Sequence, residues 1–305
     1  MASFTFTGSA VSGGLSQINY PLNTYVPLDD LRSYFSLASG NTADDSQMLD
    51  LIYRSSRSVD RYTRRHFFPK METRYYDLPN NDTLRLDRDF ISFSGLSHMN
   101  GASEIDSSVW WGARGEDWNL KPFDRIVLDD TSGSAFNYSG TPRRAVIVNG
   151  VTGYHETDGW VFSGTSLLGD LTTTNRQLFI GGSLGQDEEG FSPRFKPGQT
   201  IKLDNEFMNV EYGSGLSYIG VKRSINGTAM ASHGSNTGIY VWKPESDIQF
   251  YTKRLASWAY MQSQSPYTER ISVPGYGSID VPGTWPKDIK SGLDRFVRRV
   301  IKVVY

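Results

Sequence analysis

The stretch at residues 42–69 constrains the fold of this chain more than any other part of the sequence. Its apolar residues recur at alternating spacings of four and three, which gathers them on one helix face with a period near 3.6 residues. The face consists of Met48, Ile52, Ser55, Val59 and Tyr62. The Thr42 hydroxyl can cap the Asp45 amide, and Pro69 stops the helix. Because one helix cannot bury such a face alone, its partners decide the architecture.

Three further stretches have the helical pattern, and all lie near the ends of the chain. Pro27 can open a short helix, because its fixed φ is tolerated in the first turn. A second stripe starts after Pro244, and a third follows Thr284, whose hydroxyl can cap it. The apolar faces consist of Leu28, Leu31 and Phe35 in the first, Ile248, Tyr251 and Leu255 in the second, and Ile289, Leu293, Phe296, Val297 and Val300 in the third.

Between these helices the pattern changes to period two and to turn chemistry, which is typical of strands. Short alternating runs recur across residues 125–242, separated by Gly, Asp or Asn, and their spacing favours an antiparallel sandwich or small barrel. Residues 72–78 and the strand that follows are predicted to form a hairpin around the turn PNNDT. Asp204 and Asn205 predict a second, tight hairpin turn.

The sequence therefore predicts an α+β fold. A discontinuous helical bundle of about four helices, drawn from both chain ends, would be interrupted by an inserted antiparallel β-sandwich or barrel domain. We expect residues 1–25, which are small, polar and rich in Gly and Ser, to form an extended N-terminal arm. The helical domain would comprise residues 26–70 and 244–305, and the inserted β-rich domain residues 71–243.

Composition excludes several classes of function. The chain has 31 Lys and Arg residues against 33 Asp and Glu, a net charge of −2 that argues against a general nucleic-acid binder. It has no cysteine, so disulfides, thiolate metal sites and thiol nucleophiles are excluded. The first residues lack the features of a signal peptide, and no apolar stretch approaches the ~20 residues that span a bilayer. We therefore expect a soluble protein with no membrane partner.

Catalytic motifs are missing from the sequence. The segment GTSLLGD has the glycine spacing of a phosphate-binding loop, but Asp170 stands where the lysine belongs. His155 and Glu156 could form an acid–base pair, yet adjacent residues on a strand point to opposite faces. The four histidines lack metal-ligand spacing. We expect no enzymatic activity, no cofactor and no metal site.

Three clusters each allow a functional and a structural interpretation. The acidic residues at 187–189 could bind calcium or form the solvated tip of a loop. Trp110, Trp111 and Trp118 could stack a sugar or pack against sheet and helix. The basic face of the last helix could meet nucleic acid or an acidic protein surface, or could face water.

The two ends of the chain resemble a known family. The segments VPLDDLRSYFSL, DDSQMLDLIYRSSRSVDRYTRRHFFP and TRYYDLPNNDTLRLDRDFISFSGL resemble the opening of tailed-bacteriophage head-tail connector proteins, also called adaptor, head-completion or neck proteins. The resemblance covers about the first 95 residues and resumes in PESDIQFYTKRLASWAYMQ and PGTWPKDIKSGLDRFVRR. Its most specific positions are Tyr62, Thr63, Arg65 and Phe67, followed by Tyr75, Tyr76 and Asp77.

A second resemblance lies inside the predicted β region. The segment EFMNVEYGSGLSYIGVKRSINGTAMASHGSNTGIYVW is similar to a β module that recurs in phage neck and tail proteins. Asn-Gly can also supply the backbone twist of a tight turn, so these residues could simply shape a loop. The positions that carry the likeness are Arg223, Asn226, Gly227, Thr228, Ala231 and His233.

The family resemblance implies a structural virion protein of the phage neck, between capsid and tail. Copies would form a homo-oligomeric ring, dodecameric by resemblance, that joins the portal vertex to the stopper or tail and lines the DNA channel. The implied partners are other copies of the chain, the portal protein, a stopper or tail-completion protein, tail fibres through the β insert, and phage DNA in transient non-specific contact. The protein would be made in the host bacterial cytoplasm and act in viral DNA packaging and ejection.

The same resemblance assigns roles to three groups of residues. Portal docking is expected of Trp285, Ile289, Leu293, Phe296 and Val300. A role in the DNA channel or in docking is expected of Arg295, Arg298, Arg299 and Lys302. Contacts between subunits are expected of Arg54, Arg57, Arg61 and Arg64. The alternative is a carbohydrate- or receptor-binding β-rich virion protein that uses the tryptophans as its platform.

Overall fold

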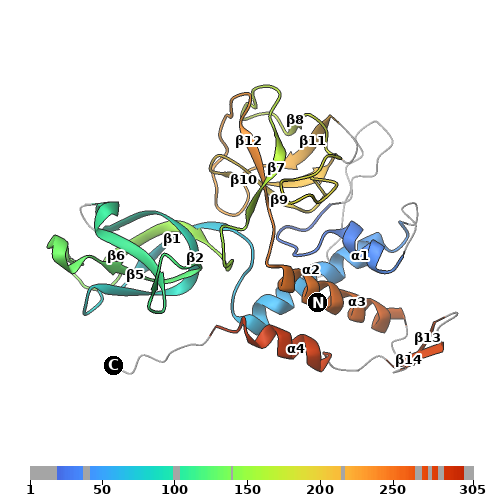
Figure 1. Ribbon diagram of the computed structural model, residues 1–305, viewed down its shortest axis with the longest axis horizontal. Helices are drawn as coiled ribbons and strands as arrows, with labels where there is room; N and C mark the ends of the chain where they lie inside the picture. The colour runs from blue at the N-terminus through green and yellow to red at the C-terminus, as the bar shows by residue number, and fades with distance from the viewer. Residues whose placement is uncertain are drawn as a thin grey trace. The chain divides into compact units, whose positions relative to one another are not determined.

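The computed structural model describes residues 19–36, 42–98, 104–138, 140–213, 217–264, 270–273, 277–280 and 285–298 (Figure 1). The chain divides into two compact units, and each is described by itself. The first unit contains the residues up to Arg64, Trp160–Ile225 and the residues from Ala229 onward. The second contains Arg65–Gly159 and Asn226–Thr228.

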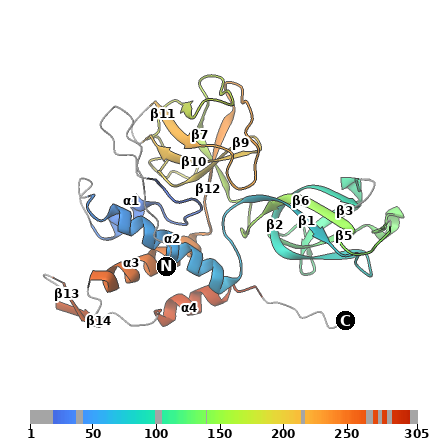
Figure 2. The same cartoon turned by 180° about the vertical axis from the view of Figure 1, so that it is seen from behind.

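Four described helices belong to the first unit: α1 (Leu28–Tyr34), α2 (Asp45–Thr63), α3 (Ser246–Gln264) and α4 (Lys287–Asp294). Helices α2 and α3 lie side by side in both views (Figures 1 and 2). Their buried side chains form one apolar cluster with α1, to which α1 and α2 contribute residues of their predicted stripes and α3 contributes Ala256. The cluster consists of Val26, Leu28, Leu31, Met48, Leu49, Ile52 and Ala256.

The ends of α2 differ from the predicted ones. The helix is capped at Asp44, whose side chain makes no capping bond, and the Asp45 amide donates to the Thr42 carbonyl rather than to its hydroxyl, at 3.3 Å. The helix ends at Thr63, before Pro69 is reached, because Arg64 adopts the left-handed conformation with φ of 57°. Within the predicted N-terminal arm, residues 1–18 lie outside the described residues, whereas the buried Tyr25 donates its amide to the Ser56 hydroxyl of α2 at 3.1 Å.

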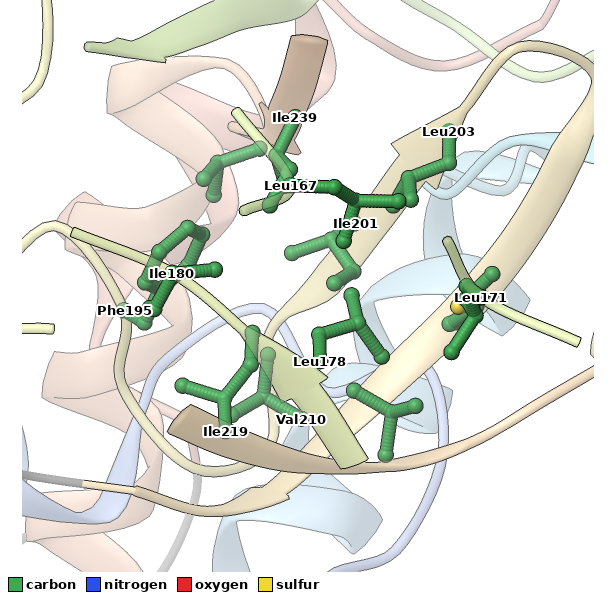
Figure 3. Close-up of a cluster of buried hydrophobic side chains, with 13 residues drawn as sticks. Leu167, Leu171, Leu178, Ile180, Phe195, Ile201, Leu203, Val210, Ile219 and Ile239 are labelled. Atoms are coloured by element: carbon green, nitrogen blue, oxygen red, sulfur yellow. The ribbon is translucent and has the colours of Figure 1, made fainter. Parts of the chain in front are cut away.

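The first unit also holds a six-stranded antiparallel sheet in the order β7-β12-β9-β10-β11-β8. Strands β9 and β10 pair Leu203 with Glu206, which confirms the predicted tight turn at Asp204 and Asn205. One face of the sheet carries a buried cluster in which Leu167, Leu178 and Ile201 point to a common interior (Figure 3). The strands are β7 (Trp160–Ser166), β8 (Gln177–Phe179), β9 (Thr200–Leu203), β10 (Glu206–Tyr212), β11 (Tyr218–Lys222) and β12 (Gly238–Trp242).

The second unit is built on another six-stranded antiparallel sheet, in the order β1-β6-β2-β5-β3-β4. Its core is a separate apolar cluster that includes Phe90, Leu96 and Ile126. Short 3₁₀ helices at Ser107–Val109 and Asp130–Ser132 connect its strands. The strands are β1 (Lys70–Tyr76), β2 (Thr83–His98), β3 (Trp110–Arg114), β4 (Asp117–Trp118), β5 (Phe123–Leu128) and β6 (Val146–Thr152).

Two more strands, β13 (Arg270–Val273) and β14 (Gly277–Asp280), pair with each other in a two-stranded antiparallel sheet. This pair of strands precedes α4 in the chain.

The predicted fold class is wrong. The chain is mostly two open antiparallel six-stranded sheets with four described helices, and it is not a helical bundle interrupted by one sandwich or barrel. The period-two runs correctly indicate strands, but periodicity does not say which strands share a sheet. The runs divide into two sets with separate cores, one of which belongs to the same unit as the helices.

Candidate functional site

The described residues hold no cluster of three or more His, Asp or Glu side chains that could bind a metal ion. The suspected pair His155 and Glu156 engages different groups. The Thr157 amide donates to Nδ1 of His155 at 3.0 Å, and the Tyr154 hydroxyl donates to Glu156 at 3.0 Å. None of the described helices has the length and apolar character of a membrane span.

The residues expected to dock on a portal are mostly buried within the first unit. Ile289, Leu293 and Phe296 have relative exposures of 2% or less. Trp285 is half-buried, and its ring centroid lies 5.8 Å from that of Tyr62 on α2. Val300 lies outside the described residues. Docking by this set stays a prediction, and for the three buried side chains it would require α4 to move.

Two polar contacts fasten α4 to its neighbours. Tyr62 donates its hydroxyl to Asp294 at 2.6 Å, and Arg254 of α3 pairs with Asp288. Gly292 faces the ring of Tyr251 so closely that an added Cβ would lie 2.0 Å from Cζ. Glycine is therefore needed at this crossing of α3 and α4.

The basic residues of the last helix are only partly described. Arg295 is exposed, pairs with Asp247 of α3 and lies over the ring of Phe296. Arg298 is half-buried. Arg299 and Lys302 lie outside the described part of the chain. The structure thus places Arg295 beside α3 and Arg298 beside the end of α2, and the contact of all four residues with DNA or portal stays a prediction.

The four arginines in and just after α2 do not form one continuous surface. Arg57 turns toward its own chain, where it pairs with Asp60 at 3.2 Å and donates to the Asn23 carbonyl at 2.7 Å. Arg54 is exposed and pairs with Asp50 at 2.6 Å. Arg61 and Arg64 are exposed. Contact with a neighbouring subunit stays a prediction for all four, and it requires the least rearrangement for the last two.

Two of the acidic residues at 187–189 pair with a lysine of the same chain. The Lys243 ammonium lies 2.6 Å from carboxylate oxygens of both Asp187 and Glu189. Asp187 also accepts the amides of Glu189 and Phe191, at 3.1 and 2.9 Å. Lys243 thus supplies positive charge to this loop. No pattern in the sequence connects the two.

The three tryptophans divide between core and surface. Trp110 packs on Phe93 at 5.5 Å and donates its indole N–H to the Ile105 carbonyl at 3.2 Å. Trp111 and Trp118 lie on the other face of the sheet, with ring centroids 5.1 Å apart, and Trp118 is 56% exposed. Alternation along β3 explains the division, because Trp110 and Trp111 must point to opposite faces.

Two of the residues that carry the β-module resemblance, Arg223 and His233, belong to a buried ionic network in the first unit. Arg223 donates to both oxygens of Glu206, at 3.0 and 2.5 Å, and these side chains are 1% and 0% exposed. His233 lies between Glu206 and Asp204, at 2.9 and 2.7 Å. Burial alone would raise the pKa of Glu206, but its hydrogen bonds with Arg223, the Ala231 amide and His233 hold that pKa below its ordinary value. The network is structural, since its groups satisfy one another.

The Asn-Gly-Thr part of the same module belongs to the second unit. Asn226 donates its side-chain amide to the Pro69 carbonyl at 2.9 Å, and its own carbonyl accepts the Met71 amide at 2.8 Å. Gly227 has φ of 83°, and a Cβ there would lie 2.3 Å from the Met71 carbonyl oxygen. These residues therefore fix a close backbone contact at the start of β1.

An aromatic and basic patch occupies the outer face of the first unit's sheet. Tyr240 pairs in register with Phe162 on one side and with Lys202 on the other. The Lys202 ammonium lies 4.9 Å from the ring centroid of Trp160 and 5.3 Å from that of Tyr240. Burial lowers the pKa of Lys202. We call these four residues the Lys202 patch.

Comparison with known proteins adds little. No family model matches the chain, and no curated protein matches it. Among solved structures, it is similar to a chain from "Neck of empty GTA particle computed with C6 symmetry". The identity is 12% and the TM-score 0.30, over 46% of this chain and 70% of that one. A likeness of this size carries no argument by itself.

Proposed function

We propose that this chain is a non-enzymatic structural protein of a tailed-phage neck, whose copies form a ring between the portal vertex and the stopper or tail. The proposal rests on the sequence resemblance at the two chain ends. The observation that carries it is that these two ends pack into one unit, with α2 in contact with both α3 and α4. Segments far apart in the sequence thus pack together, and α1, α2 and α3 share one apolar cluster.

The C-terminal attachment to the portal is best assigned to residues 299–305, with the sequence RVIKVVY. Docking by Ile289, Leu293 and Phe296 would cost the first unit part of its core, because those side chains are buried. The stretch that follows them mixes apolar residues with Arg299 and Lys302, and this composition suits a surface that is partly apolar and partly acidic.

Attachment can be tested with portal rings of the phage that encodes the chain. Electron micrographs of the wild-type protein mixed with these rings should show added density on the portal, and a chain lacking residues 299–305 should remain folded without adding density. A chain lacking residues 1–18 is the matched control and should still attach. Failure of the wild-type chain to attach would refute the neck function, whereas attachment of the C-terminal deletion would refute only the assignment of the docking segment.

The proposed role includes only weak contact with DNA. Arg299 and Lys302 would make sequence-independent phosphate contacts that salt screens, so they would ease passage of DNA rather than hold it. Reversing both charges should change DNA retention in assembled particles and leave attachment to the portal intact. Loss of attachment instead would make them docking residues.

One observation favours the second candidate function, a carbohydrate-binding role. Trp118 is more than half exposed and contacts Trp111, and an exposed indole can bind the apolar face of a sugar ring. A glycan array tests this function with W118A as the variant and W110A as the control. Saturable binding that is lost in W118A would support it.

A further inference from the structure

Among the described residues, Lys202 has no carboxylate partner, and in this it differs from the partly buried Lys243 and Lys196. Lys243 pairs with Asp187 and Glu189, and Lys196 pairs with Asp30 at 2.7 Å. Within the part of the chain that the structure describes, the Lys202 ammonium contacts only the rings of Trp160 and Tyr240. Ring faces attract a cation but accept its hydrogen bonds poorly. A partly desolvated ammonium in this setting favours an incoming carboxylate.

One ring beside Lys202 is exposed, and a second lies next to it. Tyr240 is 38% exposed, and the centroid of Phe162 lies 5.5 Å from its ring. Gly238 borders both rings without a side chain of its own, since an added Cβ would lie 3.3 Å from Phe162 and 3.5 Å from Tyr240. The patch therefore suits a ligand that brings a carboxylate together with an aromatic or aliphatic group.

The chain itself carries such a group at residues 116–120, with the sequence EDWNL, all of them exposed. Strand β4 forms an edge of the second unit's sheet, and Asp117 and Trp118 pair there with Arg114 and Ala113 of β3. Glu116 is fully exposed, with its closest described cation, Arg125, at 4.0 Å. We call residues 116–120 the acidic hairpin.

Apolar side chains flank the carboxylates of the acidic hairpin. Trp118 is 56% exposed and Leu120 44% exposed. The Asn119 amide donates to the Gly112 carbonyl at 2.9 Å, which holds the hairpin against β3. Because the hairpin is already ordered, binding would cost little conformational entropy. It has the negative charge that the Lys202 patch lacks, and apolar side chains that can pack on the rings of that patch.

We propose that the acidic hairpin of one copy docks on the Lys202 patch of a second copy. The carboxylate of Glu116 or Asp117 accepts hydrogen bonds from Lys202, and Trp118 and Leu120 cover Phe162 and Tyr240. The two surfaces are different residues of the same chain, so the contact is head-to-tail, and such contacts generate rings when the rotation closes. The contact would thus be a subunit interface of the proposed ring. Only the place of this interface in the phage neck rests on the proposed function.

Zero-length crosslinking of the full chain tests this contact. A carbodiimide joins a lysine amine to a carboxylate only when the two touch. Equal amounts of isotopically labelled and unlabelled protein are mixed, treated with and without portal rings, and analysed by mass spectrometry. We expect crosslinks between Lys202 and Glu116 or Asp117 that combine one labelled and one unlabelled peptide. Their absence, or crosslinks that never mix the isotopes, would overturn the proposal.

Charge reversal provides a second test that does not depend on the crosslinker. K202E should weaken self-association measured by sedimentation, and E116K/D117K should weaken it equally. The triple variant should restore it, because the pair is reversed on both sides. K222E changes the same charge on the exposed Lys222 of β11 and is the matched control.

A further variant, Y240A, keeps the test valid if K202E does not fold, since it removes an exposed ring and leaves the charge unchanged. Weak association in K202E and in E116K/D117K without rescue in the triple variant would refute the pairing. So would sugar binding by Trp118 in a chain that does not self-associate.

The two proposals fail separately. Mixed crosslinks without attachment to portal rings would refute the neck function and leave this contact standing. Attachment to portal rings without mixed crosslinks would refute the contact alone.

Discussion

The backbone amide of Arg298 donates a hydrogen bond to the carbonyl of Thr63 at 2.8 Å. Thr63 is the last residue of α2, and Arg298 is the last described residue of the chain. The carbonyls of a final helical turn have no partner within their own helix, so this bond also completes the end of α2. The C-terminal region thus stabilises the first unit as far as Arg298.

We expect L293A to destabilise the first unit strongly. Leu293 is fully buried, and truncating a buried leucine to alanine costs about 2–5 kcal/mol, because transfer energy is lost and a cavity remains. Lys290 is exposed on the same helix, so K290A should change stability by no more than about 0.5 kcal/mol. Urea denaturation of both variants measures the difference. Equal, small effects would show that α4 is not part of the core.

The buried ionic network should show strong coupling between its members. E206L leaves Arg223 and His233 buried without their shared anion, and breaking a buried pair in this way costs about 3–5 kcal/mol. The double variant E206L/R223M removes both charges and should be more stable than E206L alone. E211Q, on the same strand, is the control. A double variant less stable than E206L would refute the coupling.

Helices were the part of the fold that the sequence predicted best. The residues of α2 repeat an apolar position once per turn over a long stretch, so both the type of element and its buried face follow from the pattern. The ends could not be predicted, because Arg64 reaches a left-handed conformation that only its neighbours stabilise. The helix ends at Thr63, several residues before Pro69, so a proline in the sequence can lie well beyond the last residue of a helix.

Strand pairing was the part that could not be predicted. Residues 72–78 and those after Thr83 were expected to form a hairpin, but β6 lies between β1 and β2 in the sheet. A turn sequence indicates that the chain changes direction, and it does not require the flanking strands to bond. The pairing of Tyr75 with Ile147 depends on core packing over a long sequence separation.

Some side-chain contacts follow from alternation along a strand, and others do not. Glu206 alternates with Met208 and Val210 on β10, so a charge on the apolar face of a strand indicated a buried partner. The division of Trp110 from Trp111 also follows from alternation once β3 is known. The contact of Lys243 with the loop at 187–189 joins residues with no shared pattern, and only the fold reveals it.

The second unit should lose stability in acid because of His66. Burial, followed by the nearby Arg88, lowers the pKa of His66 to about 4 from 6.5, and its Nε2 has no hydrogen-bond partner among the described residues. The folded unit keeps the ring neutral while the unfolded chain takes up a proton, so stability is complete above pH 6.5 and falls as the pH drops toward about 4. The loss is about 3 kcal/mol at most. Urea denaturation across this range should give a flatter profile for H66Q, and an unchanged profile would contradict this role.

The first unit should respond to acid in the opposite direction because of Asp60. Burial raises the pKa of this carboxyl to about 6 from 3.8, against the lowering effects of Arg57 and of the hydrogen bond from the Tyr25 hydroxyl. A raised folded pKa means that the contribution to stability is complete below pH 3.8 and is lost as the pH rises through about 6. The difference is about 3 kcal/mol at most.

D60N is the informative variant, because the amide oxygen can still accept from Tyr25 while the group no longer titrates. Its stability should be nearly constant between pH 4 and 6, where the wild-type first unit changes. D50N is the matched control, since Asp50 is exposed on the same helix and pairs with Arg54 at the surface. Fluorescence-detected unfolding that resolves the two units would measure both profiles. A wild-type first unit that weakens between pH 6 and pH 4, as the second unit does, would contradict the assignment to Asp60.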